Sequence, residues 1–222
     1  MSNVNLISMS KPSAITGCHT ANDLIAYTAR ISNPTNQNNS ETAPKLIQYL
    51  IRENHWSPFE MVHMTLEIKT TRDIARQIIR HRSFAFQEFS QRYALSENFS
   101  AREARLQDTK NRQNSVDIDK SDPVQARLAE EWSIKQHKLM RDVKEIYKWA
   151  VQNGIAKEQA RAVLPEGNTE TTLYMSGTLR SWIHYCELRM GNGTQKEHRE
   201  VAEGCWDIIT HHFPDVKKAL VK

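Results

Sequence analysis

The segment MVHMTLEIK, residues 61–69, alternates apolar and polar side chains without a break. Successive side chains of a β-strand point to opposite faces, so Val62, Met64, Leu66 and Ile68 would share one face. The polar residues between them would lie on the other face. A strand with one buried and one wetter face is typical of an antiparallel sheet. The segment therefore predicts a small, mainly antiparallel sheet.

Helical spacing predicts most of the remaining elements. We expect helices over residues 40–54, 70–82, 122–154, 178–189 and 194–213, and a second short strand over 171–177. Ser40 and Asp122 are candidate N-caps, and Thr194 with Glu197 has the pattern of a capping box. Residues 94–121 are polar and nearly patternless, which predicts a long loop or lid. The expected fold class is α+β, with several helices packed on the sheet.

Composition bounds the class of protein. At 222 residues and 39% hydrophobic content, we expect one domain over residues 1–222. A net charge of +4 suits phosphorylated substrates and only weakly indicates nucleic-acid binding. We find no signal peptide and no apolar run long enough for a bilayer, which predicts a soluble intracellular protein with no membrane partner. Three widely spaced cysteines favour a reduced compartment and no metal site.

The stretch RHRSFAFQEFSQRY, residues 80–93, concentrates basic and aromatic side chains. If residues 84–93 are extended, Glu88, Ser90 and Arg92 share a side and present an acceptor, a hydroxyl and a cationic fork. Such a trio suits a nucleotide. Gln77 and Arg80 lie one turn apart on the preceding helix and could face the same pocket. The alternative is that the arginines only complete a helix C-terminus.

Two further stretches carry candidate site residues. In NHWSPFE, residues 54–60, His55 could act on a proton or a phosphate, although alone it is better explained as a surface or capping residue. In residues 161–189, Arg180 and His184 share a helix face and Arg189 lies at the helix end. These arginines reach solvent, pair with acids, or bind an anion. No GxGxxG, P-loop or HExxH motif is present.

Together these stretches resemble the flavin-dependent thymidylate synthases, whose signature is RHRxxSxNExSxRY. The chain matches it from Arg80 to Tyr93 and departs at Ala85 and Gln87. HWSPFE, RAVLP and LRSWIHYCELR are similar to three other segments of that family and follow in the same order.

The resemblance implies that dUMP becomes dTMP, with methylenetetrahydrofolate giving the carbon, FAD mediating and NADPH reducing the flavin. It also implies a thymidylate synthase-complementing-protein-like fold and a homotetramer whose sites combine several subunits. The location would be the cytoplasm, that of the host if the source is viral.

The resemblance also implies site residues. Residues that would hold dUMP are Gln77, Arg80, Glu88, Ser90, Gln91, Arg92, Arg161 and Arg189. Residues that would touch FAD are Ser57, Arg80, His81, Arg82, Glu88, Thr178, Arg180 and His184. His55 would lie near flavin and folate, and Arg189 would be catalytic, favouring the enolate-like form of the pyrimidine.

Neither Cys186 nor Cys205 has an activating neighbourhood in the sequence, so we expect no cysteine nucleophile. Two other interpretations stay open. One is a nucleic-acid-binding module that uses the arginine and aromatic cluster for stacking. The other is a degenerate relative that keeps the dUMP pocket and has lost flavin or folate use.

Overall fold

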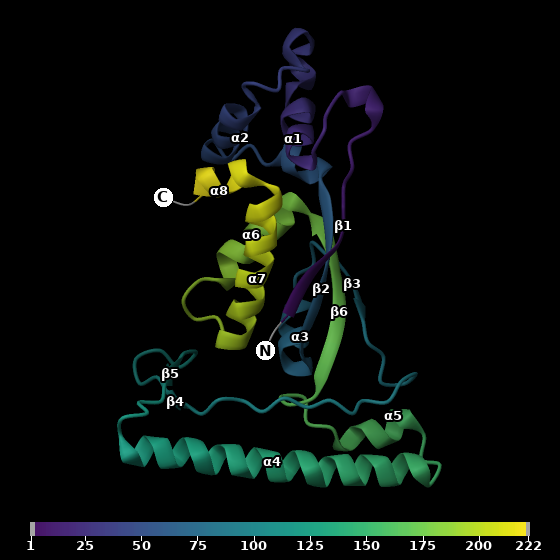
Figure 1. Ribbon diagram of the computed structural model, residues 1–222, viewed down its shortest axis with the longest axis vertical. Helices are drawn as coiled ribbons and strands as arrows, with labels where there is room; N and C mark the ends of the chain where they lie inside the picture. The colour runs from purple at the N-terminus through teal and green to yellow at the C-terminus, as the bar shows by residue number, and fades with distance from the viewer. Residues whose placement is uncertain (1–2, 221–222) are drawn as a thin grey trace.

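The structure is a computed structural model that describes residues 3–220, built around a four-stranded antiparallel sheet (Figure 1). The strand order is β1-β2-β6-β3. The strands are β1 (Asn3–Met9), β2 (His63–Thr71), β6 (Glu170–Thr178) and β3 (Ala85–Glu88). β2 and β6 pair over their whole length, from His63 opposite Thr178 to Thr71 opposite Glu170. The predicted antiparallel sheet is confirmed.

One face of the sheet forms the core. Helices α6 (Leu179–Arg189) and α7 (Lys196–His212) stand on this face in Figure 1. The alternating apolar residues of β2 and β6 are buried against them, together with Trp182 of α6 and Cys205 of α7. The opposite face is polar, and Thr65 donates a hydrogen bond to Ser176 across it at 2.9 Å. The burial pattern predicted for residues 62–68 is confirmed.

Two groups of helices lie at opposite ends of the sheet (Figure 1). α1 (Ala21–Ala29), α2 (Ala43–Arg52) and α8 (Pro214–Leu220) pack at one end. α4 (Pro123–Gln152) and α5 (Lys157–Ala160) lie at the other end. α3 (Arg72–Ile78) follows β2 directly. Short 3-10 helices are η1 (Ala14–Thr16), η2 (Arg30–Ser32), η3 (Pro34–Asn36), η4 (Ser57–Met61) and η5 (Arg161–Val163).

The polar stretch 94–121 is not a free lid. It runs between the sheet and α4 (Figure 1) and contains a small hairpin, β4 (Arg105–Gln107) and β5 (Ser115–Asp117). Gln136 of α4 accepts a hydrogen bond from the Arg102 backbone amide at 2.8 Å and donates one to the Arg102 carbonyl at 2.8 Å. These bonds hold the segment against the long helix. Most of the segment is a loop as predicted, but the prediction missed its hairpin and its contacts with α4.

The predicted caps divide into one that is confirmed and two that are wrong. The Asp122 carboxylate accepts from the Val124 backbone amide and begins α4 as expected. Ser40 does not begin α2, which starts at Ala43 with a proline in its first turn. α7 starts at Lys196 instead of following Thr194, and no capping box forms because the Glu197 carboxylate accepts from Arg105.

Candidate active site

Two of the predicted site residues, Arg189 and His81, are in direct contact. Arg189 Nε, at the end of α6, donates to His81 Nε2 at 2.9 Å. That ring nitrogen therefore carries no proton. Burial, and then the charge of Arg189, lower the pKa of His81 to about 4, which keeps the imidazole neutral at physiological pH. Among residues 3–220 the terminal nitrogens of Arg189 make no hydrogen bond or ion pair, so they can bind an acceptor.

A close backbone contact fixes the turn that carries His81. The Phe84 ring packs edge-on against Trp182, with centroids 4.8 Å apart, and lies over Gly177 of β6. A Cβ added at Gly177 would lie 2.4 Å from Phe84 Cδ1, closer than carbon atoms approach. Glycine at this position lets the ring sit against the sheet, which places residues 80–82 beside the end of α6.

A second group of predicted residues lies around the start of α6. The Thr178 hydroxyl caps the helix by accepting from the Ser181 backbone amide. Arg180 pairs with Glu60 at 2.8 Å, and the His184 ring stands edge-on to Trp56 with centroids 4.6 Å apart. Arg180 Nε is buried without a hydrogen-bond partner in the described part of the chain. An unpaired buried donor is costly, so this position fits a ligand that brings an acceptor.

Two residues predicted near this group are exposed. Ser57 opens η4 on the surface. His55 precedes it, and its ring makes an edge contact with Tyr49 at 6.0 Å between centroids. Neither side chain donates or accepts a hydrogen bond within residues 3–220. Both are therefore accessible to a ligand or to another protein surface.

A third group follows β3. Glu88 Oε1 accepts from the Thr171 hydroxyl at 3.0 Å and lies 3.3 Å from Arg72 Nη1, so its second oxygen is left to bind. The strand ends at Glu88, and residues 91–93 form a turn. Arg92 therefore points to Glu158, at 3.5 Å. The prediction that Glu88, Ser90 and Arg92 share one side of a strand is wrong, because the chain leaves the sheet after Glu88.

The other predicted residues after β3, and the two arginines beside His81, differ in exposure. Gln91 is buried and donates to Ser96 Oγ at 3.3 Å, a structural contact within the turn. Arg161 opens η5, one turn after Glu158, and its guanidinium makes no ion pair within the described residues. The same holds for Arg80 and Arg82, which are exposed on either side of His81. Guanidinium groups without acids are available to anions.

The three groups are separated along the elements that carry them. Arg180 and Arg189 are nine residues apart on α6, about 13 Å along a helix axis. Glu88 pairs with Leu173 of β6. Leu173 is five residues from Thr178, so about 16 Å of strand separates Glu88 from the group at the start of α6. One chain thus presents three separate groups of candidate site residues.

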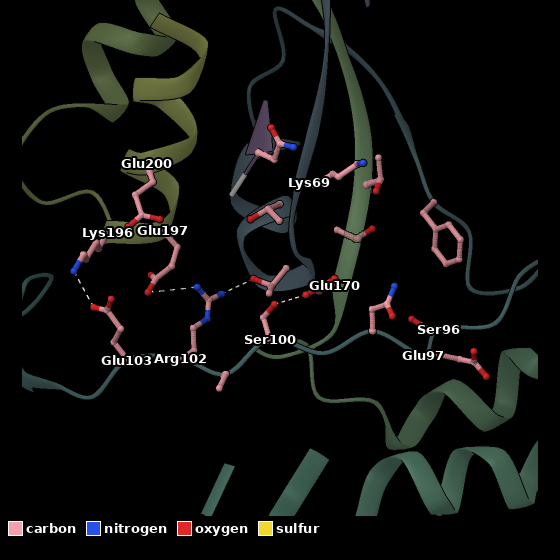
Figure 2. A pocket seen from close by; sticks show the side chains of 18 of the residues that line it. Lys69, Ser96, Glu97, Ser100, Arg102, Glu103, Glu170, Lys196, Glu197 and Glu200 are labelled. Atoms are coloured by element: carbon pink, nitrogen blue, oxygen red, sulfur yellow. Dashed lines mark hydrogen bonds and ion pairs between the residues drawn. The ribbon is translucent and has the colours of Figure 1, made fainter. Parts of the chain in front are cut away.

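A cavity of about 790 Å³ lies between the sheet, residues 95–103 and the start of α7 (Figure 2). Arg102 is at its centre, with a hydrogen bond to Asp73 at 2.7 Å and an ion pair with Glu197 at 3.4 Å. None of the predicted site residues lines it. Sequence reasoning missed Arg102 because nothing in residues 94–121 has a recognisable spacing.

The residues behind Arg189 and His81 were also missed. His198 is completely buried and contacts Tyr185 and Gln77. Burial, and then the charges of Arg189 and His81, lower its pKa to about 3. Only a pattern of polar residues on the buried face of a helix could have signalled it, and a single histidine on such a face is not distinctive.

The two cysteines near this region are poor nucleophiles. Cys186 and Cys205 are buried, and burial raises the pKa of each thiol well above its ordinary value. Among residues 3–220 no three histidine, cysteine, aspartate or glutamate side chains are grouped as metal ligands would be. In the same range, no helix has both the length and the apolar character to cross a membrane.

Comparison with known proteins places the chain in a family. A family model described as thymidylate synthase complementing protein matches residues 15–215. The chain belongs to this family. A probable flavin-dependent thymidylate synthase of Paramecium bursaria Chlorella virus 1 is 53% identical over 97% of both chains. A flavin-dependent thymidylate synthase of Synechocystis is 51% identical over 98% of both chains.

A solved structure agrees with this assignment. The crystal structure of a UMP/dUMP methylase, PolB of Streptomyces cacaoi, bound with 5-Br dUMP, has a TM-score of 0.80 and 25% identity. It covers 99% of this chain and 94% of its own chain. The α+β fold class and the family resemblance stated from the sequence are both confirmed.

Proposed function

We propose that this protein is a flavin-dependent thymidylate synthase that methylates dUMP to dTMP, with methylenetetrahydrofolate as carbon donor and NADPH as reductant. The observation that carries the proposal is the contact between Arg189 and His81. A neutral imidazole holds the guanidinium by its inner nitrogen, and the two outer nitrogens are left as a planar pair of donors. The names of the relatives and of the structural neighbour support the same reaction.

Arg189 would act by electrostatic stabilisation. Uracil is a poor nucleophile, and a permanent positive charge beside its ring oxygen and nitrogen favours the enolate-like form. Arginine stays protonated, so the group stabilises charge and does not transfer a proton. His81 would fix the direction of the guanidinium, because an N–H···N bond at 2.9 Å restrains rotation about the last bonds of the side chain.

The monophosphate would be bound by arginines that lack acidic partners. Arg80 and Arg161 fit this role because each is free of ion pairs in the described part of the chain. Glu88 would accept from the ligand through the oxygen that Thr171 does not occupy. The further residues proposed to hold dUMP are Gln77, Ser90, Gln91, Arg92 and Arg189.

The flavin would be FAD, which supplies the redox chemistry that protein side chains lack. The buried, unpaired Nε of Arg180 supports this assignment, since an acceptor-rich ligand would complete it. The aromatic contact between Trp56 and His184 offers an apolar wall nearby. Residues proposed to hold it are Ser57, Arg80, His81, Arg82, Glu88, Thr178, Arg180 and His184, with His55 near flavin and folate.

The site would be assembled from several subunits of a homotetramer. Two observations support this. The predicted residues form three separate groups in one chain, and α4 exposes apolar side chains that include Leu128, Trp132, Ile146 and Trp149. Such a surface is typical of one covered by another chain. Residues 1–222 would form one domain, and the enzyme would work in the cytoplasm.

An absorption spectrum tests the proposed function. The protein, purified or reconstituted with FAD, is expected to show flavin bands, and these bands are expected to shift when dUMP is added. The control is 2′-deoxyuridine, which differs from dUMP only in lacking the phosphate that the unpaired arginines would bind. A protein that takes up no flavin under any of these conditions would refute the proposal. Binding of dUMP without flavin uptake would favour a relative that has lost the redox step.

Replacing both buried cysteines by alanine is expected to leave turnover within about threefold of the unmodified enzyme, because their raised thiol pKa values exclude a thiolate nucleophile. Cys186→Ala/Cys205→Ala creates cavities and lowers the melting temperature, so activity is measured well below that temperature. Release of tritium from 5-tritiated dUMP is the assay. A folded double variant without turnover would establish a thiol mechanism.

A further inference from the structure

Five polar side chains form a continuous hydrogen-bonded chain behind Arg189 and His81. This series of hydrogen bonds runs from Glu197 through Gln195, Gln77 and His198 to Tyr185. The five residues come from three different helices and the cap of α7. The two ends of the chain differ chemically. One end is a carboxylate and the other is a phenol, so the direction of every hydrogen bond between them can be deduced.

The donor and acceptor of each hydrogen bond can be assigned starting from Glu197. Its carboxylate accepts from Arg105 and forms an ion pair with Arg102 at 3.4 Å. Burial alone raises the pKa of Glu197. A hydrogen bond from its own backbone amide, the charge of Arg102 and hydrogen bonds from Arg105 and Gln195 together outweigh burial and leave that pKa below its ordinary value. The group is therefore an ionised carboxylate, which only accepts hydrogen bonds.

The two glutamines follow from this constraint. Gln195 lies 2.9 Å from Glu197 Oε2 and must donate through Nε2, since its oxygen would face another acceptor. Its Oε1 is thereby turned toward Gln77, which must donate through its own Nε2, at 2.8 Å. Gln77 Oε1 then faces His198. Reversing either amide would place oxygen against oxygen or nitrogen against nitrogen at hydrogen-bond distance.

His198 has one arrangement left. Its Nδ1 lies 3.2 Å from Gln77 Oε1 and must carry the proton. The ring is completely buried and neutral, so Nε2 is bare and accepts from the Tyr185 hydroxyl at 3.1 Å. The tautomer of His198 is thus set by the Glu197 carboxylate, from which it is separated by three successive hydrogen bonds.

We propose that His198 is a positioning residue for substrate binding, because its Nδ1–H and Gln195 Oε1 hold both ends of the Gln77 amide and turn the second N–H of Gln77 toward the nucleotide. The role rests on the proposed function, in which Gln77 binds dUMP. An oriented N–H matches dUMP well, since its phosphate, sugar and base edges are mainly acceptors. Without His198, Gln77 is held only at its nitrogen and its amide can swing.

Two isosteric variants separate the two ring nitrogens. In His198→Asn the amide nitrogen takes the place of Nδ1 and still reaches Gln77, whereas the contact with Tyr185 is lost. In His198→Gln the amide reaches the place of Nε2 and contacts Tyr185, and the donor to Gln77 is lost. We expect His198→Gln to weaken equilibrium binding of radiolabelled dUMP about tenfold, and His198→Asn to stay within about threefold. Tyr185→Phe, which leaves Nδ1 in place, should behave like His198→Asn.

The outcomes distinguish this role from the proposed function. If the unmodified protein does not bind dUMP, the proposed function fails and the role of His198 fails with it. If the unmodified protein binds dUMP and the two His198 variants bind it equally well, only the role of His198 is overturned. Equal losses in both variants, with matching losses of melting temperature, would mark His198 as a structural residue and also overturn the role.

A second measurement needs no ligand and reads the unmodified protein, with a variant used only to assign the signals. The ¹⁵N shifts of histidine-labelled protein report the tautomer of each ring, and the His198 signals are assigned by their absence in His198→Asn. We expect a neutral Nδ1–H ring from pH 6 to 8. An Nε2–H ring would reverse the hydrogen-bond chain and overturn the proposal.

Discussion

Arg189→Ala is expected to abolish release of tritium from 5-tritiated dUMP, with a loss of about a thousandfold in kcat. Removing one preoriented donor from a site of developing negative charge costs about 10²- to 10³-fold, and Arg189 offers two donors and a full charge. The side chain contributes little to the core, because it is partly exposed and, within residues 3–220, hydrogen-bonds only to His81. The variant should therefore fold, and it should retain flavin.

Two controls define the interpretation of Arg189→Ala. Arg112→Ala, in the turn between β4 and β5, removes the same charge from an exposed side chain and should leave turnover unchanged. Arg189→Lys keeps the charge without the planar pair of donors, and should recover only part of the lost rate. Turnover above a tenth of normal in folded Arg189→Ala would remove Arg189 from the catalytic role.

The same variant predicts a change in His81. The charge of Arg189 is the smaller of the two causes that lower the pKa of His81, after burial. Removing a positive charge makes protonation easier, so the pKa of His81 should rise from about 4 and remain below the ordinary value. Histidine titration by NMR measures this shift. An unchanged pKa would mean that the two side chains are not in contact in solution.

Local patterns were sufficient to predict two strands of the sheet, β2 and β6, and the buried face of β2, whereas β1 was not predicted. The alternation in residues 62–68 depends only on strand geometry, and Asp122 with Pro123 is a helix start that needs no tertiary partner. Ser40 and Thr194 failed as caps because their helices start later in the chain. At α7 the decisive partner was Arg105, which is 92 residues from Glu197 in the sequence.

The site residues were identified from the family resemblance, but their arrangement in space could not be predicted from the sequence. Spacing predicted that Glu88, Ser90 and Arg92 point the same way, and the end of β3 at Glu88 removed the basis for that prediction. Arg189 and His81 are 108 residues apart, and Gln77 and His198 are 121 apart. Contacts of that separation depend on how α3, α6 and α7 pack, which no local pattern encodes.

Arg102→Ala is expected to lower the free energy of unfolding by about 3 kcal/mol, the largest loss of stability for a charged side chain that we predict. The Arg102 side chain is 17% exposed, and its guanidinium joins four parts of the fold. It donates to the Gly167 carbonyl at 3.0 Å, to Asp73 at 2.7 Å and to the Thr71 hydroxyl, and it pairs with Glu197. Alanine would leave the Asp73 and Glu197 carboxylates, both largely shielded from water, without this charge.

Arg76→Ala is the matched control for Arg102→Ala. Its ion pair with Glu166, at 3.4 Å, joins two side chains that are 49% and 58% exposed, so its loss should cost less than about 0.5 kcal/mol. Urea unfolding followed by circular dichroism measures both variants under the same conditions. The backbone of residue 102 stays bonded to Gln136 in Arg102→Ala, so any loss reports the guanidinium itself. Equal losses in the two variants would mean that Arg102 is another surface charge and that the cavity of Figure 2 does not depend on it.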